Sequence, residues 1–119
     1  LGIYSSVDMM EVKDPLEVLK GLDDTPDIVI LHRGIDVESK GKTRWQIIQD
    51  IKDEFPGKKI LLSVAGGIRE DTAKEALKKG ADILIVGRYI TQSKDVEKAA
   101  RGLLNLVGED MDLYRIHVE

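Results

Sequence analysis

Two glycine motifs in the second half of the sequence have the residue types that bind an anion. Gly66-Gly67 follows the apolar run 60–64, and Gly87-Arg88 follows the apolar run 82–86. Glycine lets the backbone approach a ligand closely and adopt positive φ, and a guanidinium forms strong charge-assisted hydrogen bonds with phosphate. These four residues therefore predict a phosphate-binding site: Gly66, Gly67, Gly87 and Arg88. The alternative is that the glycines only form turns, because a single glycine motif is weak evidence.

An aspartate and a histidine follow two apolar runs in the first half of the sequence. Asp8 follows the run 2–7, and His32 follows the run 27–31. Polar residues after strands gather where α/β folds build their sites, so His32 is predicted to be catalytic or to contact the substrate. The alternatives are that His32 packs within a loop and that Asp8 caps the next turn. No His, Asp and Glu cluster has metal-site spacing, so we expect no metal ligands in this chain.

These residues are positioned by four apolar runs that alternate with four helical patterns. Strands are predicted over 2–7, 27–31, 60–64 and 82–86, and helices over 15–22, 43–55, 69–79 and 93–107. Asp14-Pro15, Thr43 and Ser93 have the residue types that begin helices, and Gly80 and Gly108 those that end them. The order predicts a parallel sheet with right-handed crossovers.

Four strands are half the number in a (β/α)₈ barrel, which typically takes about 250 residues. The chain could form a small open sheet or half of a barrel. We favour the parallel (β/α)₄ half of a TIM-type barrel, because every polar candidate follows the carboxyl end of a strand. Residues 1–108 are predicted to form the half-barrel, and 109–119 a tail that is a strand or an arm reaching another subunit. The free sheet edges of a half-barrel favour pairing with a second copy.

Composition excludes several classes of function. The chain has 119 residues, a net charge of −4 and no cysteine, so disulfides and thiolate chemistry are excluded and nucleic-acid binding is disfavoured. No apolar run approaches the roughly 20 residues of a membrane span, and no signal peptide is visible. We expect a cytoplasmic protein without a nucleic-acid or membrane partner. The first residue, Leu1, suggests a piece of a longer polypeptide, and a processed terminus is the alternative.

Five stretches of the sequence together match a known pattern. They are 7–10 with Asp14, 32–36, 64–68, 86–91 and 110–116. Through them nearly the whole chain resembles the C-terminal half of the orotidine-5′-phosphate decarboxylase superfamily. Within it, the chain is most similar to 3-hexulose-6-phosphate synthases, especially archaeal forms fused to formaldehyde-activating enzyme.

The resemblance implies a role for each candidate residue. The strands would be the fifth to eighth of a barrel, and the glycine motifs with Arg88 would hold the phosphate of a sugar phosphate substrate. His32 would handle an enediolate oxygen or a proton, and Asp8 would bind substrate hydroxyls. The implied reaction joins formaldehyde to ribulose 5-phosphate, and the parent enzyme would use Mg²⁺.

The sequence also departs from this family, because it lacks the Asp-x-Lys-x-x-Asp motif and the acidic residues that hold Mg²⁺. We therefore expect the chain alone to bind phosphate weakly and to be inactive or nearly so, with the Mg²⁺ ligands elsewhere. Its predicted partner is a second copy or a complementary half-barrel. One alternative is a fragment of an orotidine-5′-phosphate decarboxylase-like enzyme, for whose longer phosphate loop residues 58–60 leave no room. The other is a non-catalytic phosphate-binding module that acts as a dimer.

Overall fold

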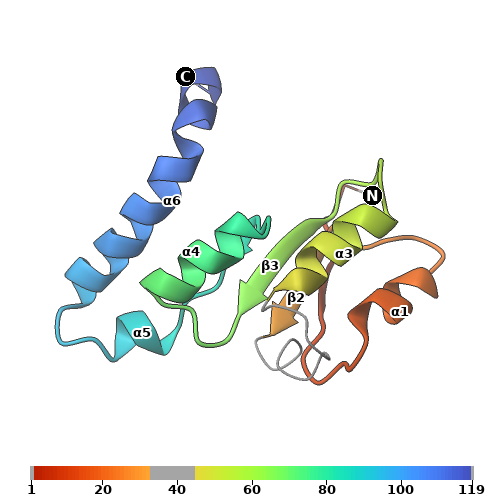
Figure 1. Ribbon diagram of the computed structural model, residues 1–119, viewed down its shortest axis with the longest axis horizontal. Coiled ribbons are helices and arrows are strands. Elements are labelled where there is room, and N and C mark those ends of the chain that lie inside the picture. The colour runs from red at the N-terminus through yellow and green to blue at the C-terminus, as the bar shows by residue number, and fades with distance from the viewer. Residues whose placement is uncertain (1, 33–44, 119) are drawn as a thin grey trace.

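The structure is a computed structural model that describes residues 2–32 and 45–118, with side chains as far as residue 108. Its sheet has four parallel strands in the order β1-β2-β3-β4. They are β1 (Ser6–Asp8), β2 (Ile28–His32), β3 (Leu61–Ala65) and β4 (Ile83–Leu84). The described helices are α1 (Pro15–Lys20), α3 (Gln46–Glu54), α4 (Glu70–Lys78), α5 (Arg88–Thr91) and α6 (Val96–Val118). The predicted parallel β/α alternation is confirmed (Figure 1).

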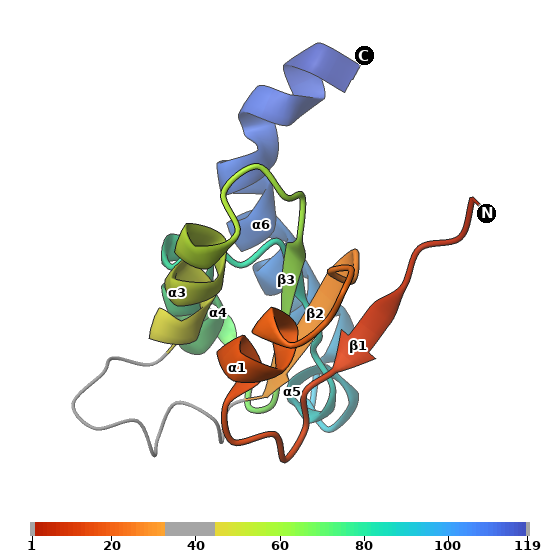
Figure 2. The ribbon, with the colours of Figure 1, turned by 90° about the vertical axis from the view of Figure 1, so that its right-hand side faces the viewer.

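Helices cover one face of the sheet, and the opposite face is less completely buried. Figure 2 shows α1, α3 and α4 on the same side of the strands. On β2, Val29 and Leu31 are fully buried on that side, whereas the intervening residues of the strand are only half-buried. Burial of each such aliphatic side chain stabilises the fold by about 1.5–3 kcal/mol. The helix-covered face therefore holds the core, which also includes Leu19, Ile48, Ile51, Leu62, Val64, Ala73 and Ala76.

Helix boundaries follow local capping chemistry where the sequence is explicit. The Asp14 side chain accepts a hydrogen bond from the Glu17 N–H (3.2 Å), and Pro15 is the first residue of α1, as predicted. Gly80 follows α4 with a φ of +102°, which confirms the predicted helix end. The predicted cap at Thr43 lies outside the described residues, and α3 instead begins after Trp45, whose φ is +65°.

Lys20 connects two helices at the surface. Its ammonium lies 3.6 Å from a Glu54 carboxylate oxygen of α3 and 3.5 Å from Glu17 of its own helix. The attraction of Glu54, and then of Glu17, raises the pKa of Lys20. The group is solvent-exposed, so this pairing contributes little to stability.

The fourth strand is shorter than predicted. The sequence predicts a buried strand over 82–86, but only Ile83 and Leu84 form β4, and both are half-buried. The strand lies at the edge of the sheet with a neighbour on one side only. Ladder contacts nevertheless continue past its ends, because Asp82 N–H donates to Leu62 O (2.8 Å) and Ile85 N–H donates to Val64 O (2.9 Å).

The C-terminal segment differs most from the prediction. Ser93 is not the cap of the last helix, because Asp95 accepts the capping bond from the Lys98 N–H (3.0 Å) and the short helix α5 precedes it. The predicted helix end at Gly108 and the strand beyond it are also wrong, since α6 continues to Val118. A glycine costs a helix only about 1 kcal/mol, which is too little to end it. The boundary proposed at residue 108 thus falls inside α6, and the tail as a separate segment stays a prediction.

No helix in the described part of the chain combines the length and apolarity needed to cross a membrane.

Candidate phosphate-binding cleft and histidine–aspartate pair

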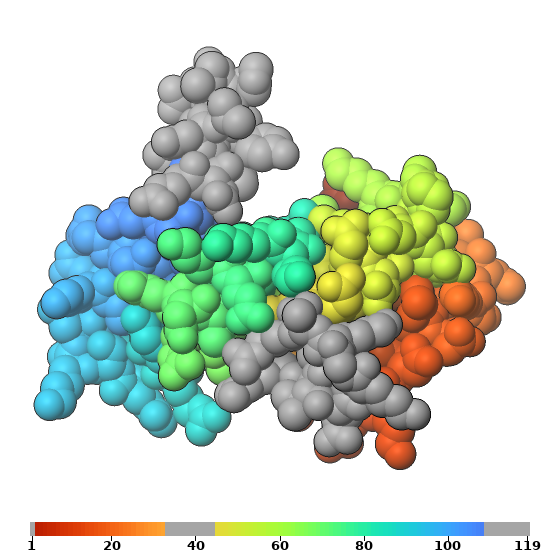
Figure 3. All heavy atoms as spheres, viewed as in Figure 1, coloured from red at the N-terminus to blue at the C-terminus, as the bar shows by residue number. Residues whose placement is uncertain are grey.

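The two glycine motifs line a single cleft. A cleft of about 570 Å³ at the carboxyl ends of β3 and β4 is bordered by all four predicted phosphate residues: Gly66, Gly67, Gly87 and Arg88. They come from two turns about 20 positions apart, which the parallel pairing of β3 with β4 brings together. In the space-filling view of Figure 3, the segments from α4 to α6 that flank this region form one end of the molecule.

Backbone geometry explains why glycine occupies the first turn. Gly66 and Gly67 have φ values of +91° and +68°, in the left-handed region that favours glycine. Gly87 is different: its φ is −109°, and a Cβ built on it would meet nothing within 4 Å. Positive φ therefore does not explain glycine at this position. The absence of a side chain at Gly87 instead leaves space in the cleft that it borders.

Charge at the cleft comes from two arginines. Arg88 is exposed and forms no ion pair with any residue that the structure describes. Arg69, at the start of α4, also lines the cleft, and its Nη2 lies 3.3 Å from the Asp71 Oδ2. Sequence reasoning missed Arg69 as a cleft residue because its position suggested only a helix start. Its position two residues after Gly67 was the signal in the sequence that could have identified it as a cleft residue.

The predicted catalytic histidine and the predicted substrate-binding aspartate are hydrogen-bonded to each other. His32 Nε2 lies 2.7 Å from Asp8 Oδ1, which also accepts a hydrogen bond from the Met10 N–H (2.9 Å). An ionised carboxylate oxygen can only accept, so Nε2 is the donor of this hydrogen bond. Asp8 thus orients the imidazole ring and selects its tautomer.

The pair and the cleft lie side by side on one edge of the sheet. His32 is in register with Ala65 on the neighbouring strand, and Ala65 borders the cleft. Neighbouring strands are about 4.8 Å apart, so a small molecule in the cleft can reach the imidazole. The six predicted site residues are therefore brought into one region.

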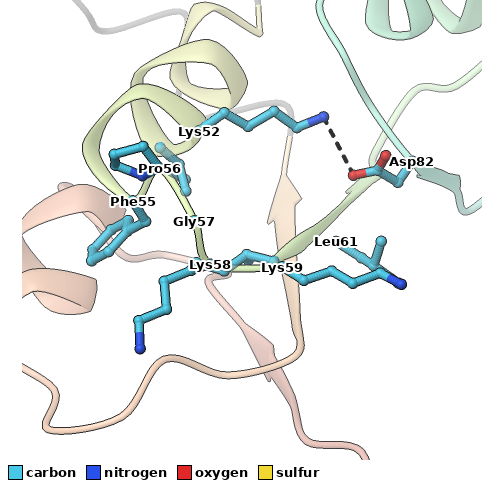
Figure 4. A pocket seen from close by; sticks show the side chains of 10 residues that line it. Lys52, Phe55, Pro56, Gly57, Lys58, Lys59, Leu61 and Asp82 are labelled. Carbon is cyan, nitrogen blue, oxygen red and sulfur yellow. Dashed lines mark ion pairs between the residues drawn. The ribbon is translucent and has the colours of Figure 1, made fainter.

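A second cleft of about 620 Å³ lies at the opposite end of the strands, between the end of α3 and the start of β3. Its lysines do not converge: Lys58 and Lys59 point away from each other, and Lys52 pairs with Asp82 (Figure 4). Lys52 also donates to Gly80 O (2.6 Å). This cleft is slightly larger than the first, but its polar groups hold α3 against the sheet and do not converge on a ligand.

Within the described residues, no group of three His, Asp or Glu side chains is placed to hold a metal ion. Asp8 and His32 are a pair without a third ligand. The part of the chain that the structure describes therefore does not fit a Mg²⁺ site, which needs several oxygen ligands.

Residues 2–103 match the family described as orotidine 5′-phosphate decarboxylase / HUMPS. The chain is 52% identical over 116 residues to the bifunctional enzyme Fae/Hps of Methanothrix thermoacetophila, and 47% identical over 118 residues to that of Methanocella arvoryzae. The matches cover 97% and 98% of this chain but only 29% and 30% of those proteins.

A solved structure has the same fold. The crystal structure of 3-hexulose-6-phosphate synthase from Salmonella typhimurium superposes with a TM-score of 0.71 at 28% identity. The superposition covers 91% of this chain and 51% of that one. The chain therefore corresponds to half of a TIM-type barrel, and it spans less than a third of the length of the curated relatives it matches.

Proposed function

Because the chain belongs to the orotidine 5′-phosphate decarboxylase / HUMPS family, we propose that it is the phosphate-binding half of a 3-hexulose-6-phosphate synthase-like aldolase. The proposed parent enzyme joins formaldehyde to ribulose 5-phosphate. This chain supplies the phosphate site and the histidine–aspartate pair, and a complementary half supplies the rest. The chain alone is proposed to bind the phosphate ester without appreciable turnover.

The observation that carries this proposal is the convergence of the glycine turns and Arg88 on one cleft beside His32. Main-chain N–H groups and a guanidinium are suited to a doubly charged phosphate ester. An arginine without an ion-pair partner among the described residues can take up the ligand without breaking an existing contact. Anchoring the phosphate there leaves the sugar carbons directed toward the imidazole.

His32 is the proton-transfer group in this proposal. Loss of a proton from C1 of ribulose 5-phosphate forms an enediolate, whose C1 then attacks the formaldehyde carbon. That attack makes the new C–C bond, and the former formaldehyde oxygen takes up a proton. His32, whose Nε2 is held by Asp8, is proposed to exchange a proton with the sugar oxygens through its other ring nitrogen, Nδ1, during these steps. A positioned general acid or base contributes about 10²–10⁴-fold to rate.

The remaining chemistry is assigned to residues outside this chain. Mg²⁺ in the parent enzyme would stabilise the enediolate oxygens, and its ligands would lie on the complementary half. That half would also cover the less completely buried face of the sheet and pair with the free edges of β1 and β4.

An NMR titration of the ¹⁵N-labelled chain tests the proposal. Ribulose 5-phosphate is expected to shift the amide signals of Gly66, Gly67 and Gly87 and to bind more tightly than UMP. Arg88→Gln should weaken binding about 10- to 100-fold, because it removes a charged hydrogen-bond donor worth about 1.5–3 kcal/mol. The matched control is Arg101→Gln, which makes the same charge change on α6 where Arg101 pairs with Glu97.

Two results would contradict the proposal. The first is that ribulose 5-phosphate leaves the three glycine amide signals unmoved, and the second is that both arginine variants bind it equally well. Tighter binding of UMP than of ribulose 5-phosphate would instead favour the decarboxylase alternative.

A further inference from the structure

Arg69 and Asp71 form an ion pair at the edge of the proposed phosphate cleft. Arg69 lines the cleft, and its Nη2 is 3.3 Å from Asp71 Oδ2. The two side chains are 57% and 72% exposed. An exposed ion pair is weak because water screens it, so a stronger anion can displace the carboxylate.

The main chain at Arg69 is fixed while its side chain is not. Arg69 N–H donates to Thr72 Oγ1 (2.8 Å), and Thr72 Oγ1 donates to Gly67 O (2.9 Å). The buried Thr72 hydroxyl therefore connects the Gly66-Gly67 turn to the start of α4. The guanidinium can exchange partners without a change in the backbone that binds the ligand.

The two arginines that line the cleft differ in their existing ion pairs. Arg88 makes no ion pair with the described residues, whereas Arg69 already shares its guanidinium with Asp71 through Nη2. Asp71 also brings a negative charge to the first turn of α4, next to the place where a phosphate would bind. Asp71 therefore opposes an anionic ligand in two ways: its charge repels the ligand, and its carboxylate already pairs with Nη2 of Arg69.

We propose that Arg69 is a second phosphate-binding guanidinium of the cleft and that Asp71 competes with the phosphoryl group for it. This inference rests on the proposed function, since it concerns the same cleft. A dianionic phosphate ester displaces Asp71 more effectively than a monoanion, because only the dianion exceeds the charge of the carboxylate. The Arg69–Asp71 pair therefore sets both the affinity and the charge preference of the site.

The test is a set of phosphate titrations on the full chain, with inorganic phosphate as the probe and the Gly66, Gly67 and Gly87 amide signals as the readout. Asp71→Asn should tighten binding by about two- to fivefold, the range for an exposed ion pair. Arg69→Gln should weaken it by a similar factor. In the Arg69→Gln background, Asp71→Asn should have much less effect, because the competition no longer exists.

Glu70→Gln is the matched control. It removes the same charge from the same helical turn, but the Glu70 side chain lies against Gly102 of α6 and does not border the cleft. It should change the Kd for phosphate by less than half as much as Asp71→Asn.

The outcomes separate this inference from the proposed function. Equal effects of Glu70→Gln and Asp71→Asn, or an undiminished effect of Asp71→Asn without Arg69, would overturn the competition and leave the phosphate site in place. A wild-type chain whose glycine amides do not respond to phosphate would overturn both.

Discussion

The hydrogen bond between Asp8 and His32 shows how single residues acquire a role from the fold. The two are 24 positions apart, yet they end neighbouring strands and point to the same face of the sheet. Each was predicted separately to be a site residue, and nothing in their spacing indicates that they touch. Their contact assigns Asp8 an orienting role toward His32 in addition to the substrate contact that stays a prediction.

Removal of two buried hydroxyls, those of Ser63 and Thr72, is expected to change the free energy of unfolding in opposite directions. Ser63 is 1% exposed, and its Oγ has no hydrogen-bond partner among the described residues. Thr72 Oγ1 donates a hydrogen bond to Gly67 O and accepts one from the Arg69 N–H. Ser63→Ala should therefore raise the free energy of unfolding by about 1 kcal/mol, whereas Thr72→Val should lower it by about 1–3 kcal/mol. Urea unfolding measures both, and a destabilised Ser63→Ala would show that the hydroxyl has a partner in solution.

At the scale of elements, the sequence predicted whether a segment is a helix, a strand or a turn better than it predicted the residue at which the segment ends. The glycine turns after β3 and β4 were predictable because glycine residues after apolar runs signal turns. The end of α6 was not predictable from the sequence, because the length of a helix depends on small differences in free energy along the chain. Gly108 lies within a helix although the same residue type ends α4 at Gly80.

These two glycines should respond oppositely to alanine. At Gly108 a Cβ would meet nothing within 4 Å, so Gly108→Ala should stabilise α6 by about 0.5–1 kcal/mol. At Gly80, φ is +102° and a Cβ would lie 3.2 Å from Lys52 Nζ, so Gly80→Ala should destabilise the fold by about 1–2 kcal/mol. Thermal melts followed by circular dichroism measure both changes. A stabilising Gly80→Ala would contradict the left-handed helix end after α4.

For the whole molecule, the open sheet is the dominant feature. Ile3, just before β1, is 82% exposed although it is apolar, and β1 and β4 each lack a neighbour on one side within the described sheet. A second copy, or a complementary half, would cover these groups in the arrangement that we propose. The match to the solved synthase spans 51% of that chain.

We expect the isolated chain to self-associate through the edge next to β1. Ile3→Lys should shift it toward monomer in light scattering after size-exclusion chromatography, without loss of thermal stability, because Ile3 contributes little to the core. The control is Leu104→Lys, since Leu104 is 69% exposed on α6, away from the sheet. If only the Leu104 variant becomes monomeric, association occurs through α6, and the proposed pairing of sheet edges is wrong.

The sequence by itself determined the parallel β/α order and the glycine turns, and it singled out the six residues that are predicted to form the site. Those features depend on hydrophobic periodicity and on residue types with strong local preferences, which act over a few positions. Only the tertiary structure decided that Gly66-Gly67 and Gly87-Arg88 share one cleft, that Asp8 holds His32, and that Arg69 lies at the same site. Each of those contacts joins atoms from separate turns or strands, so it depends on strand register and packing, which local preferences do not specify.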